Sequence, residues 1–343
     1  MVTMADVARR AGVSTATVSH VLNNTRSVSA DTRAAVLAAV EETAYTPNTV
    51  ARSLATSRTT TLGLVLSAIS NPYFGELLSS AEAAAATAGY TLLLVDPHED
   101  PEYERTVVAR LHHHRVDGVV LAPSPHPDAA LEYLARHEVP TVLLDRLITD
   151  GLASSLDQVG SENREATATL TRHLVGHGHT RIALVAGLGG LTTTDERCAG
   201  FHQALDEAGV QHVPALEVSG ESATEPARAA MTELLALPDP PTAVVVGNNS
   251  MTIGVIAALR DAGARVPEDV AVVAFDDFAW ADLFHPRLTV MAQPFAQIAS
   301  EAVRLLLRRR AHPDAPVEVQ QLAPSFVVRE SCGCPRDDGP VVP

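Results

Sequence analysis

The chain has 343 residues, a formal net charge of −16 and 46% hydrophobic residues, so it is long enough for more than one domain. Such an acidic composition argues against a nucleic-acid binder that relies on overall positive charge. No apolar stretch is long enough to cross a membrane, and no charged segment followed by an apolar one marks a signal peptide. Three cysteines fit a reducing compartment, and we expect a cytoplasmic protein.

The charge is unevenly distributed along the chain. Residues 1–60 contain six arginines and four acidic residues, a net charge of +2, which leaves −18 for the remainder. An acidic body repels phosphate, so any binding to nucleic acid should involve residues 1–60 alone, with an affinity that falls as the salt concentration rises. The weak positive charge of residues 1–60 also implies that one copy binds nucleic acid weakly. A dimer should supply the remaining affinity.

Two short helices joined by a tight turn are predicted in residues 3–23. Thr3 and Asp6 have the spacing of a capping box, and Gly12 permits the positive φ at which the first helix would end. Ser14 is the expected N-cap of the second helix. The apolar residues at helical spacing that should pack this pair together are Val7, Ala8, Ala11, Val13, Val18, Val21 and Leu22.

The second helix should present small and polar side chains away from this core. They are Thr15, Ala16, Thr17, Ser19, His20 and Asn23. Such a face suits a helix that lies in a major groove and presents its first residues to base edges. A third helix is expected from its N-cap Ser29 to about Ala44, with Val36, Leu37 and Val40 facing inward. A three-helix bundle without a ligand is the alternative that these residues leave open.

Residues 48–55 predict one further short helix, which bears an exposed leucine, Leu54. Eight residues are too few for an isolated helix to be stable in water. We therefore expect this segment to fold only when another molecule holds it.

The motifs of this N-terminal region resemble those of the lactose/galactose repressor family. The resemblance is carried by Ala5-Asp6-Val7-Ala8, Ala11-Gly12-Val13-Ser14, Thr17-Val18-Ser19, Val21-Leu22-Asn23, Val28-Ser29, Thr32-Arg33, Tyr45-x-Pro47-Asn48 and Ala51-Arg52-x-Leu54, and it extends to about Glu330. It implies two hinge helices that pair across a dimer in the minor groove, where the residue matching Leu54 inserts as a wedge at the operator centre. The predicted DNA-contacting residues are Thr3, Ser14, Thr15, Ala16, Thr17, Ser19, His20, Asn23, Ser29, Asn48, Val50, Ala51, Arg52 and Leu54.

From Thr61 onward, short apolar runs alternate with helical stretches. The expected strands are residues 62–66, 91–95, 118–122, 141–145, 182–186, 216–218, 243–247 and 270–274. The expected helices are residues 74–88, 103–113, 129–137, 163–176, 195–208, 226–237 and 250–262. Residues 116–121 correspond to 242–246, and 139–146 to 266–277, so the pattern repeats at the scale of a lobe. This predicts an α/β fold with two doubly wound parallel sheets and a ligand cleft beyond the strands' carboxyl ends.

The predicted organisation has four regions. Residues 1–46 form the helix-turn-helix head, residues 47–60 the hinge helix and linker, residues 61–330 the two-lobed effector-binding and dimerisation domain, and residues 331–343 a tail. The family resemblance implies the same body, a periplasmic-binding-protein-like sensor.

Polar residues that follow predicted strands are the candidates for the effector site. Tyr73 and Phe74 could stack on a sugar or base, with the hydrophobic core as the alternative. Surface ion pairing is the alternative for Asp145 and Arg146. Ser124, Thr193, Arg197, Asn249 and Asp276 complete the set. The resemblance implies effector binding for Arg197 in particular, whereas Asn249 stands where the family often has aspartate.

One departure from the family pattern bears on the ligand. The purine-binding branch carries an arginine where this chain has Leu191. The resemblance therefore implies a neutral sugar, sugar derivative or nucleoside rather than a purine.

No cofactor, metal or catalytic machinery is expected. The glycine-rich residues 186–190 lack the acidic residue of a dinucleotide site. Cys332-x-Cys334 has no second ligand pair nearby in the sequence, and His177-Gly178-His179 is interpreted as a solvated helix end. The three histidines at 112–114 point about 100° apart on a helix and do not converge. Asp276-Asp277 has no nucleophile placed with it.

These features predict a ligand-controlled transcriptional repressor. Its expected partners are a double-stranded, pseudo-palindromic operator and a sugar-like effector. It should act as a homodimer, and a tetramer is left open. The alternative is a solute-binding module or a sugar-acting enzyme with an incidental helical head. The intact hinge segment counts against both.

Overall fold

The computed structural model describes residues 2–23, 26–45, 59–67, 72–278 and 281–335. The chain folds as two compact units, Met1–Thr59 and Thr60–Pro343, here called the head and the body. The hinge positions Asn48, Val50, Ala51, Arg52 and Leu54 lie outside the described residues, and so do the side chains of Asn23, Tyr73 and Phe74.

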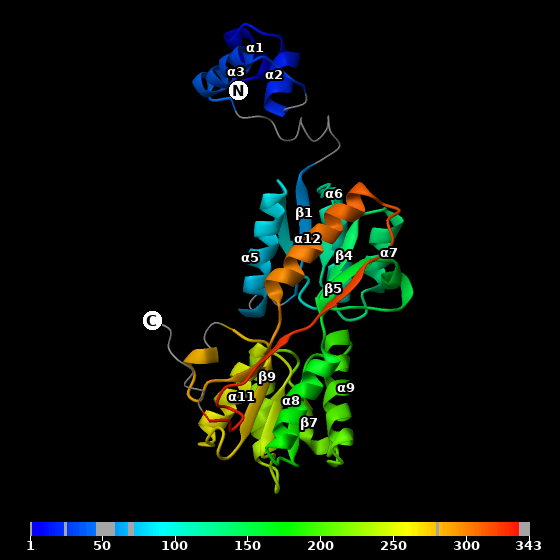
Figure 1. Ribbon diagram of the computed structural model, residues 1–343. Coiled ribbons are helices and arrows are strands. Elements are labelled where there is room, and N and C mark those ends of the chain that lie inside the picture. The colour runs from blue at the N-terminus through cyan, green and yellow to red at the C-terminus, as the bar shows by residue number, and fades with distance from the viewer. Residues whose placement is uncertain (1, 24–25, 46–58, 68–71, 279–280, 336–343) are drawn as a thin grey trace. The chain divides into compact units, whose positions relative to one another are not determined.

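The head contains the three predicted helices, α1 (Met4–Ala11), α2 (Thr15–Asn23) and α3 (Ala30–Thr43) (Figure 1). Its buried core consists of Val7, Ala8, Val18, Val21, Val36 and Ala39. One inward assignment is wrong: Leu37 is 49% exposed. The buried face of α3 continues from Val36 to Ala39, at helical spacing, and Leu37 lies about 100° around the helix from Val36.

The three predicted caps of the head are confirmed. The Asp6 carboxylate accepts hydrogen bonds from the backbone N–H (2.9 Å) and the hydroxyl (2.6 Å) of Thr3, and Gly12 follows α1 at φ 66°. Ser14 Oγ accepts from the backbone N–H of Thr17 at 3.1 Å, and Ser29 Oγ accepts from Thr32 at 3.3 Å. These side chains satisfy amides that helix starts leave without intrahelical partners.

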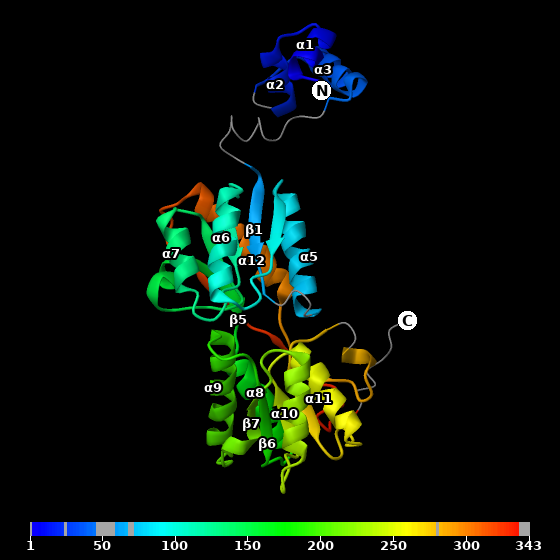
Figure 2. The ribbon, with the colours of Figure 1, turned by 180° about the vertical axis from the view of Figure 1, so that it is seen from behind.

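The body consists of two lobes, each built on a six-stranded sheet (Figures 1 and 2). The first sheet has the order β11-β5-β4-β3-β1-β2 and the second the order β12-β10-β9-β8-β6-β7. The strands of the first are β1 (Thr61–Val65), β2 (Thr91–Val95), β3 (Val119–Leu121), β4 (Thr141–Leu144), β5 (Asp157–Ser161) and β11 (Val319–Leu322). Those of the second are β6 (Ile182–Ala186), β7 (Glu217–Ser219), β8 (Ala243–Val246), β9 (Ala271–Phe275), β10 (Thr289–Ala292) and β12 (Ser325–Val327).

Pairing is parallel throughout the first sheet, and in the second only β12 is antiparallel to its neighbour β10. The predicted internal repeat is confirmed, because β3 and β8 occupy equivalent places in the two sheets, as do β4 and β9. The helices of the first lobe are α5 (Pro72–Thr87), α6 (Pro101–His113), α7 (Asp128–Arg136) and α12 (Phe295–Ala311). Those of the second are α8 (Arg164–Gly176), α9 (Thr192–Glu207), α10 (Thr224–Leu235) and α11 (Asn249–Asp261).

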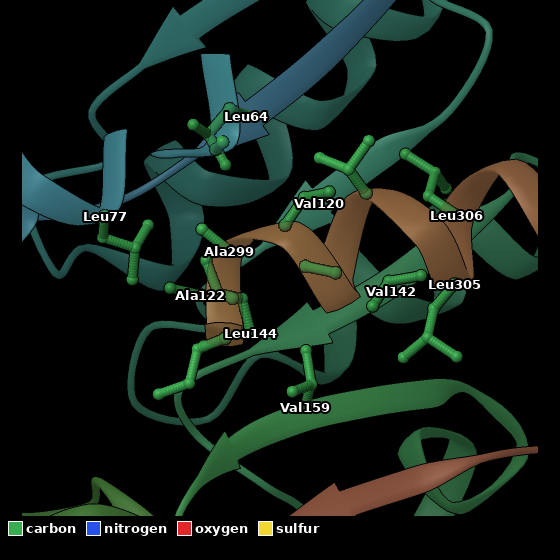
Figure 3. Close-up of a cluster of buried hydrophobic side chains, with 14 of the residues drawn as sticks. Leu64, Leu77, Val120, Ala122, Val142, Leu144, Val159, Ala299, Leu305 and Leu306 are labelled. Atoms are coloured by element: carbon green, nitrogen blue, oxygen red, sulfur yellow. The ribbon is translucent and has the colours of Figure 1, made fainter. Parts of the chain in front are cut away.

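In the part of the body that the structure describes, the chain passes between the lobes three times, after β5, after β10 and after β11. The prediction contained only the first of these passages. After β10 the chain returns as α12, whose apolar residues pack against the first sheet. Figure 3 shows Ala299, Leu305 and Leu306 of this helix beside Val142 and Leu144 of β4. Burying apolar surface in this way stabilises the lobe by roughly 25 cal/mol per Å².

An ion-pair network reinforces the same junction. Asp157, at the start of β5, is fully buried. Its Oδ2 lies 2.9 Å from Nε of Arg309, and its Oδ1 lies 3.0 Å from Nη2 of Arg308. The backbone N–H of Glu318 also donates to Oδ1, at 2.8 Å. One carboxylate therefore joins β5 to α12 and to the segment that leads into β11.

The residues expected to begin a separate tail start inside the second lobe. Ser331 and Cys332 are buried, and the backbone N–H of Val272 in β9 donates to the carbonyl of Ser331 at 2.7 Å. Among the described residues, no helix is both long and apolar enough to cross a bilayer.

Candidate effector site and nucleic-acid interface

A pocket lies between the two lobes of the body and encloses about 630 Å³ not filled by atoms, part of it open to solvent. Its lining comes from the carboxyl ends of β4, β6, β8 and β9, where doubly wound sheets place their ligands. The polar lining residues are Glu99, Asp145, Arg146, Thr193, Thr194, Arg197, Ser222, Asn248, Asp276 and Gln293.

Two aspartates related by the internal repeat reach this pocket. Asp145 follows β4 and Asp276 follows β9, and both adopt positive φ, at 68° and 75°. The Asp276 carboxylate accepts a 2.6 Å hydrogen bond from Nε2 of Gln293. Burial raises the pKa of Asp276, the nearby Asp145 charge adds to this, and Arg197 and Gln293 oppose it. The repeat therefore brings two carboxylates from different lobes to one cavity.

Arg197, on α9, is held in a fixed orientation in the pocket. Its Nε donates to Oδ1 of Asn163 at 2.8 Å, and its Nη1 donates to the carbonyl of Gly247 at 2.5 Å. Its guanidinium lies 3.7 Å from the ring centroid of Phe275, a cation–π arrangement. Asn163 precedes α8 at the first passage between the lobes. Arg197 therefore contacts Asn163 at a passage between the lobes, Gly247 after β8 and Phe275 at the end of β9. It also lines the cavity.

Arg146 is buried rather than part of a surface ion pair, so that alternative is wrong. Its Nη1 and Nη2 donate to the two Glu99 carboxylate oxygens at 2.8 and 2.6 Å, and Nη1 also donates to the carbonyl of Pro123 at 2.6 Å. Burial disfavours the guanidinium charge, but its bonds to Glu99 and the nearby Asp145 and Glu104 raise the pKa of Arg146. This bidentate geometry makes Arg146 a rigid wall of the pocket.

Two candidates do not line the pocket. The backbone N–H of Ser124 donates to Oε2 of the buried Glu104 at 2.6 Å. Asn249 is fully buried at the start of α11, where its backbone N–H lies 3.4 Å from Oδ2 of Asp276. Within the described residues, neither side-chain polar atom of Asn249 has a hydrogen-bond partner. Asn249 therefore contacts the lining residue Asp276 from outside the pocket, whereas the contact of Ser124 is with Glu104.

Sequence reasoning missed five polar lining residues: Glu99, Thr194, Ser222, Asn248 and Gln293. Asn248 lies two residues after the end of β8, next to the predicted Asn249. Its Oδ1 caps α11 by accepting a hydrogen bond from the backbone N–H of Met251 at 2.8 Å. Gln293 follows β10, a strand that was not predicted. The signal in the sequence is a polar residue directly after the apolar run 290–292.

The head presents its predicted DNA-contacting residues on α2 and at its cap. Ser14, Thr15 and Ala16 are exposed, as are Thr3 and Ser29, whereas Thr17, Ser19 and His20 are half-buried. Val18 and Val21 turn the opposite face of α2 into the head's core. An exposed, largely uncharged helix start of this kind has the size and polarity for a major groove.

Comparisons with known proteins agree with both units. Residues 3–48 match the family described as bacterial regulatory proteins, lacI family, and residues 171–332 match a periplasmic binding protein-like domain. The HTH-type transcriptional repressor PurR of Erwinia tasmaniensis is 36% identical over 341 residues, which cover 99% of this chain and 98% of the relative. PurR of Haemophilus influenzae strain PittEE is 34% identical over 335 residues, covering 96% and 98%.

Solved structures give the same result. The lac repressor dimer bound to operator and the anti-inducer ONPF is 29% identical, with a TM-score of 0.86 over 96% of this chain and 99% of that one. A transcriptional regulator CelR–cellobiose complex is 31% identical, with a TM-score of 0.72 over 96% and 100%. These relatives are named as transcriptional repressors or regulators. The chain belongs to the lacI family of bacterial regulatory proteins, and it is a DNA-binding transcriptional regulator with an effector-binding domain.

Proposed function

We propose that this regulator binds a pseudo-palindromic operator as a homodimer in the cytoplasm, and that a neutral, sugar-like molecule in the interlobe pocket controls the binding. The observation that carries the effector proposal is the convergence of Asp145, Asp276 and Arg197 on one cavity. Carboxylates accept and guanidiniums donate hydrogen bonds, so together they match the hydroxyl groups of a polyol, which do both.

The charges of the lining favour a neutral ligand. The lining contains three carboxylates, Glu99, Asp145 and Asp276, and two guanidiniums, Arg146 and Arg197. Arg146 is already engaged by Glu99 in a bidentate pair. A phosphate or carboxylate would therefore meet an excess of negative charge in a largely buried pocket, where uncompensated charge is costly.

The wall formed by Leu191 argues against a purine, although the curated relatives are named PurR. Leu191 lines the pocket and is 4% exposed, at the position where the purine-binding branch carries arginine. Two relatives of known structure are described with bound sugars, cellobiose in one and ribose in the other. The apolar side chain of Leu191 beside polar lining residues suits a sugar ring, which presents both apolar and polar surface.

The proposed control couples two equilibria. A ligand that contacts both lobes favours one lobe arrangement, and the three passages between the lobes would carry that change through the body. The hinge residues 48–55 would then order on the operator centre, with Leu54 as the wedge. By linkage, the factor by which ligand changes operator affinity must equal the factor by which operator changes ligand affinity.

The experiment has two parts, both with the full-length protein. Selection from fragmented genomic DNA should retain pseudo-palindromic sites. Retention of no such site would overturn the operator proposal. A thermal-shift panel should contain neutral monosaccharides and disaccharides, nucleosides, purine bases and sugar phosphates, because a bound ligand raises the unfolding temperature. Stabilisation by purine bases or sugar phosphates alone would overturn the effector proposal.

Variants locate the site. Asp276→Ala and Arg197→Ala should abolish the thermal shift and the ligand's effect on operator affinity while leaving ligand-free operator binding unchanged. Asp277→Asn is the matched control, since Asp277 pairs with Arg329 and does not line the pocket. A normal ligand response in both pocket variants would show that the ligand binds elsewhere.

A further inference from the structure

Four potential metal ligands meet at the end of the second lobe. His173 and His177 lie one helical turn apart at the carboxyl end of α8, and Cys332 and Cys334 lie in the segment that follows β12. One ligand atom from each residue, an imidazole nitrogen or a thiol sulfur, lies within 4.8 Å of all the others. More than 150 residues separate the pairs in sequence, so the tertiary structure alone brings them together.

The spacing of these atoms fits a tetrahedral ion. Cys334 Sγ lies 3.6 Å from Nε2 of His173 and 3.3 Å from Nε2 of His177. With zinc bonds of about 2.3 Å to sulfur and about 2.0–2.1 Å to nitrogen, a tetrahedral site has sulfur-to-nitrogen edges of about 3.5 Å. Two of the edges are thus already near the length that a bound ion requires.

The surroundings resemble the second shell of a metal site. Thr289 Oγ1 donates to Cys332 Sγ at 3.1 Å and accepts the backbone N–H of Arg329 at 2.9 Å. Its single proton is therefore directed at the sulfur. Phe326 packs edge-on against the His173 ring, with centroids 5.1 Å apart, and fixes its orientation. Such supporting contacts orient ligands and tune their metal affinity.

We propose that His173, His177, Cys332 and Cys334 form a structural Zn²⁺ site that fastens the C-terminal segment to α8. A donor set of two thiolates and two imidazoles in tetrahedral geometry is one that zinc prefers. The site provides four protein ligands and leaves no open position, so its role is structural. Binding of Zn²⁺ to the native state stabilises the second lobe.

This site is separate from the effector pocket. His173 lies ten residues along α8 from Asn163, the residue that holds Arg197, a distance of about 15 Å at the usual helical rise. The expectation of no metal site rested on the lack of a second ligand pair near Cys332-x-Cys334. The missing pair is on α8, and His177, interpreted as a solvated helix end, belongs to it.

A second cluster in the same lobe provides an internal comparison. His202, His212 and Glu217 also lie within ligand distance of one another. There the Glu217 Oε2 atom lies 2.7 Å from Nε2 of His202 and 2.9 Å from Nε2 of His212. Hydrogen bonds therefore account for the close approach of these three residues. This cluster offers only three ligands and no thiolate partner among them.

The test uses full-length protein, stripped with a chelator, kept reduced and titrated with Zn²⁺ or Co²⁺. We expect one tightly bound ion per chain, an upward shift in the unfolding temperature with Zn²⁺, and thiolate-to-cobalt charge-transfer absorption with tetrahedral visible bands for Co²⁺. Loss of a direct ligand should weaken binding beyond the roughly 10- to 100-fold cost of losing a second-shell partner.

The variants separate ligand loss from misfolding. His177→Ala changes an exposed side chain, so the chain should fold normally and lose the ion; Cys334→Ser should lose the cobalt–thiolate band. Cys198→Ser and His212→Gln are the matched controls, and both should retain wild-type affinity and spectra. Absence of a thiolate–cobalt band in the wild type, or unchanged zinc affinity in His177→Ala and Cys334→Ser, would overturn the proposal.

Discussion

Gly200 provides the sharpest structural prediction, because it lies where α9 crosses the start of α8. A Cβ added at this position would lie 2.0 Å from the carbonyl oxygen of Arg164 and 3.1 Å from the backbone nitrogen of Ala168. A real Cβ atom essentially never approaches another atom closer than 3.0 Å. In the Gly200→Ala variant, α8 and α9 would therefore have to move apart by about 1 Å. The clashing atom is a backbone carbonyl oxygen, which cannot avoid the contact by a change of rotamer. A side-chain atom could do so.

The magnitude follows from the cost of overpacking. Overpacked cores typically lose about 1–3 kcal/mol, and a clash with backbone should reach the upper end of that range. At about 2–4 °C per kcal/mol for a domain of this size, Gly200→Ala should unfold on the order of 6–12 °C below wild type. The effector response should weaken as well, because Arg197 lies one turn before Gly200 and bonds to Asn163 at the start of α8.

Gly176→Ala is the matched control for this prediction. It makes the same chemical change at the end of α8, where an added Cβ would meet no atom within 4 Å. It should stabilise the body slightly, by up to about 1 kcal/mol, since alanine favours the helix. Thermal unfolding of both full-length variants, followed by circular dichroism, is the assay. Equal unfolding temperatures for Gly200→Ala and wild type would refute the reasoning about helix approach.

Three further predictions concern the buried charges and the hinge. Asp157→Asn should destabilise the body by roughly 3–5 kcal/mol, measured by urea unfolding, because it leaves Arg308 and Arg309 without their buried partner. Burial raises the pKa of Glu104, so the folded state holds that proton more tightly than the unfolded state. Stability should therefore fall as the pH rises from about 4.5 through the raised pKa, and Glu104→Gln should flatten this decline. Leu54→Ala should lower operator affinity in a DNA-binding titration while ligand binding stays intact, because the proposed wedge is lost.

The first two of these predictions have a matched control. Asp269→Asn removes an exposed pair with Arg265 and should lower the unfolding free energy by no more than about 1 kcal/mol. Glu102→Gln, on the exposed start of α6, should keep the wild-type pH dependence. Equal destabilisation by Asp157→Asn and Asp269→Asn, or an unaltered pH profile in Glu104→Gln, would contradict the role given to burial. Unchanged operator affinity in Leu54→Ala would remove the wedge.

Much of the local structure could be predicted because its causes lie within a few residues. The caps at Thr3, Ser14 and Ser29 are short-range hydrogen bonds. The strands 91–95 and 182–186 are predicted to the residue, since runs of apolar residues bounded by loops mark strands of a parallel sheet. Asp145, Arg146, Thr193, Arg197 and Asp276 line the pocket because carboxyl ends of parallel strands meet at one edge of a sheet.

Strand β5 shows why other elements were missed. All five of its residues are buried although most are polar. Gln158 Nε2 donates to the carbonyl of Ile148 at 2.8 Å, and Oε1 accepts that residue's N–H at 2.8 Å, while Asp157 is neutralised by arginines far along the chain. A run of polar residues predicts a loop when the sequence is considered alone, because hydrophobic periodicity carries no information about partners that lie far along the chain.

By itself the sequence determined the class of regulator, the helices of the head, most of the alternating strands and half of the polar pocket residues, because these depend on local pattern and on motif. Only the tertiary structure decided that α12 returns to the first lobe, that Leu37 faces outward, and that Cys332 and Cys334 meet two histidines of α8. The exposure of Leu37 depends on how α3 packs in the head, whereas the other two outcomes depend on which surfaces pack together across more than a hundred residues. Interactions of that range are set by the packing of the whole body, and no short window of sequence contains them.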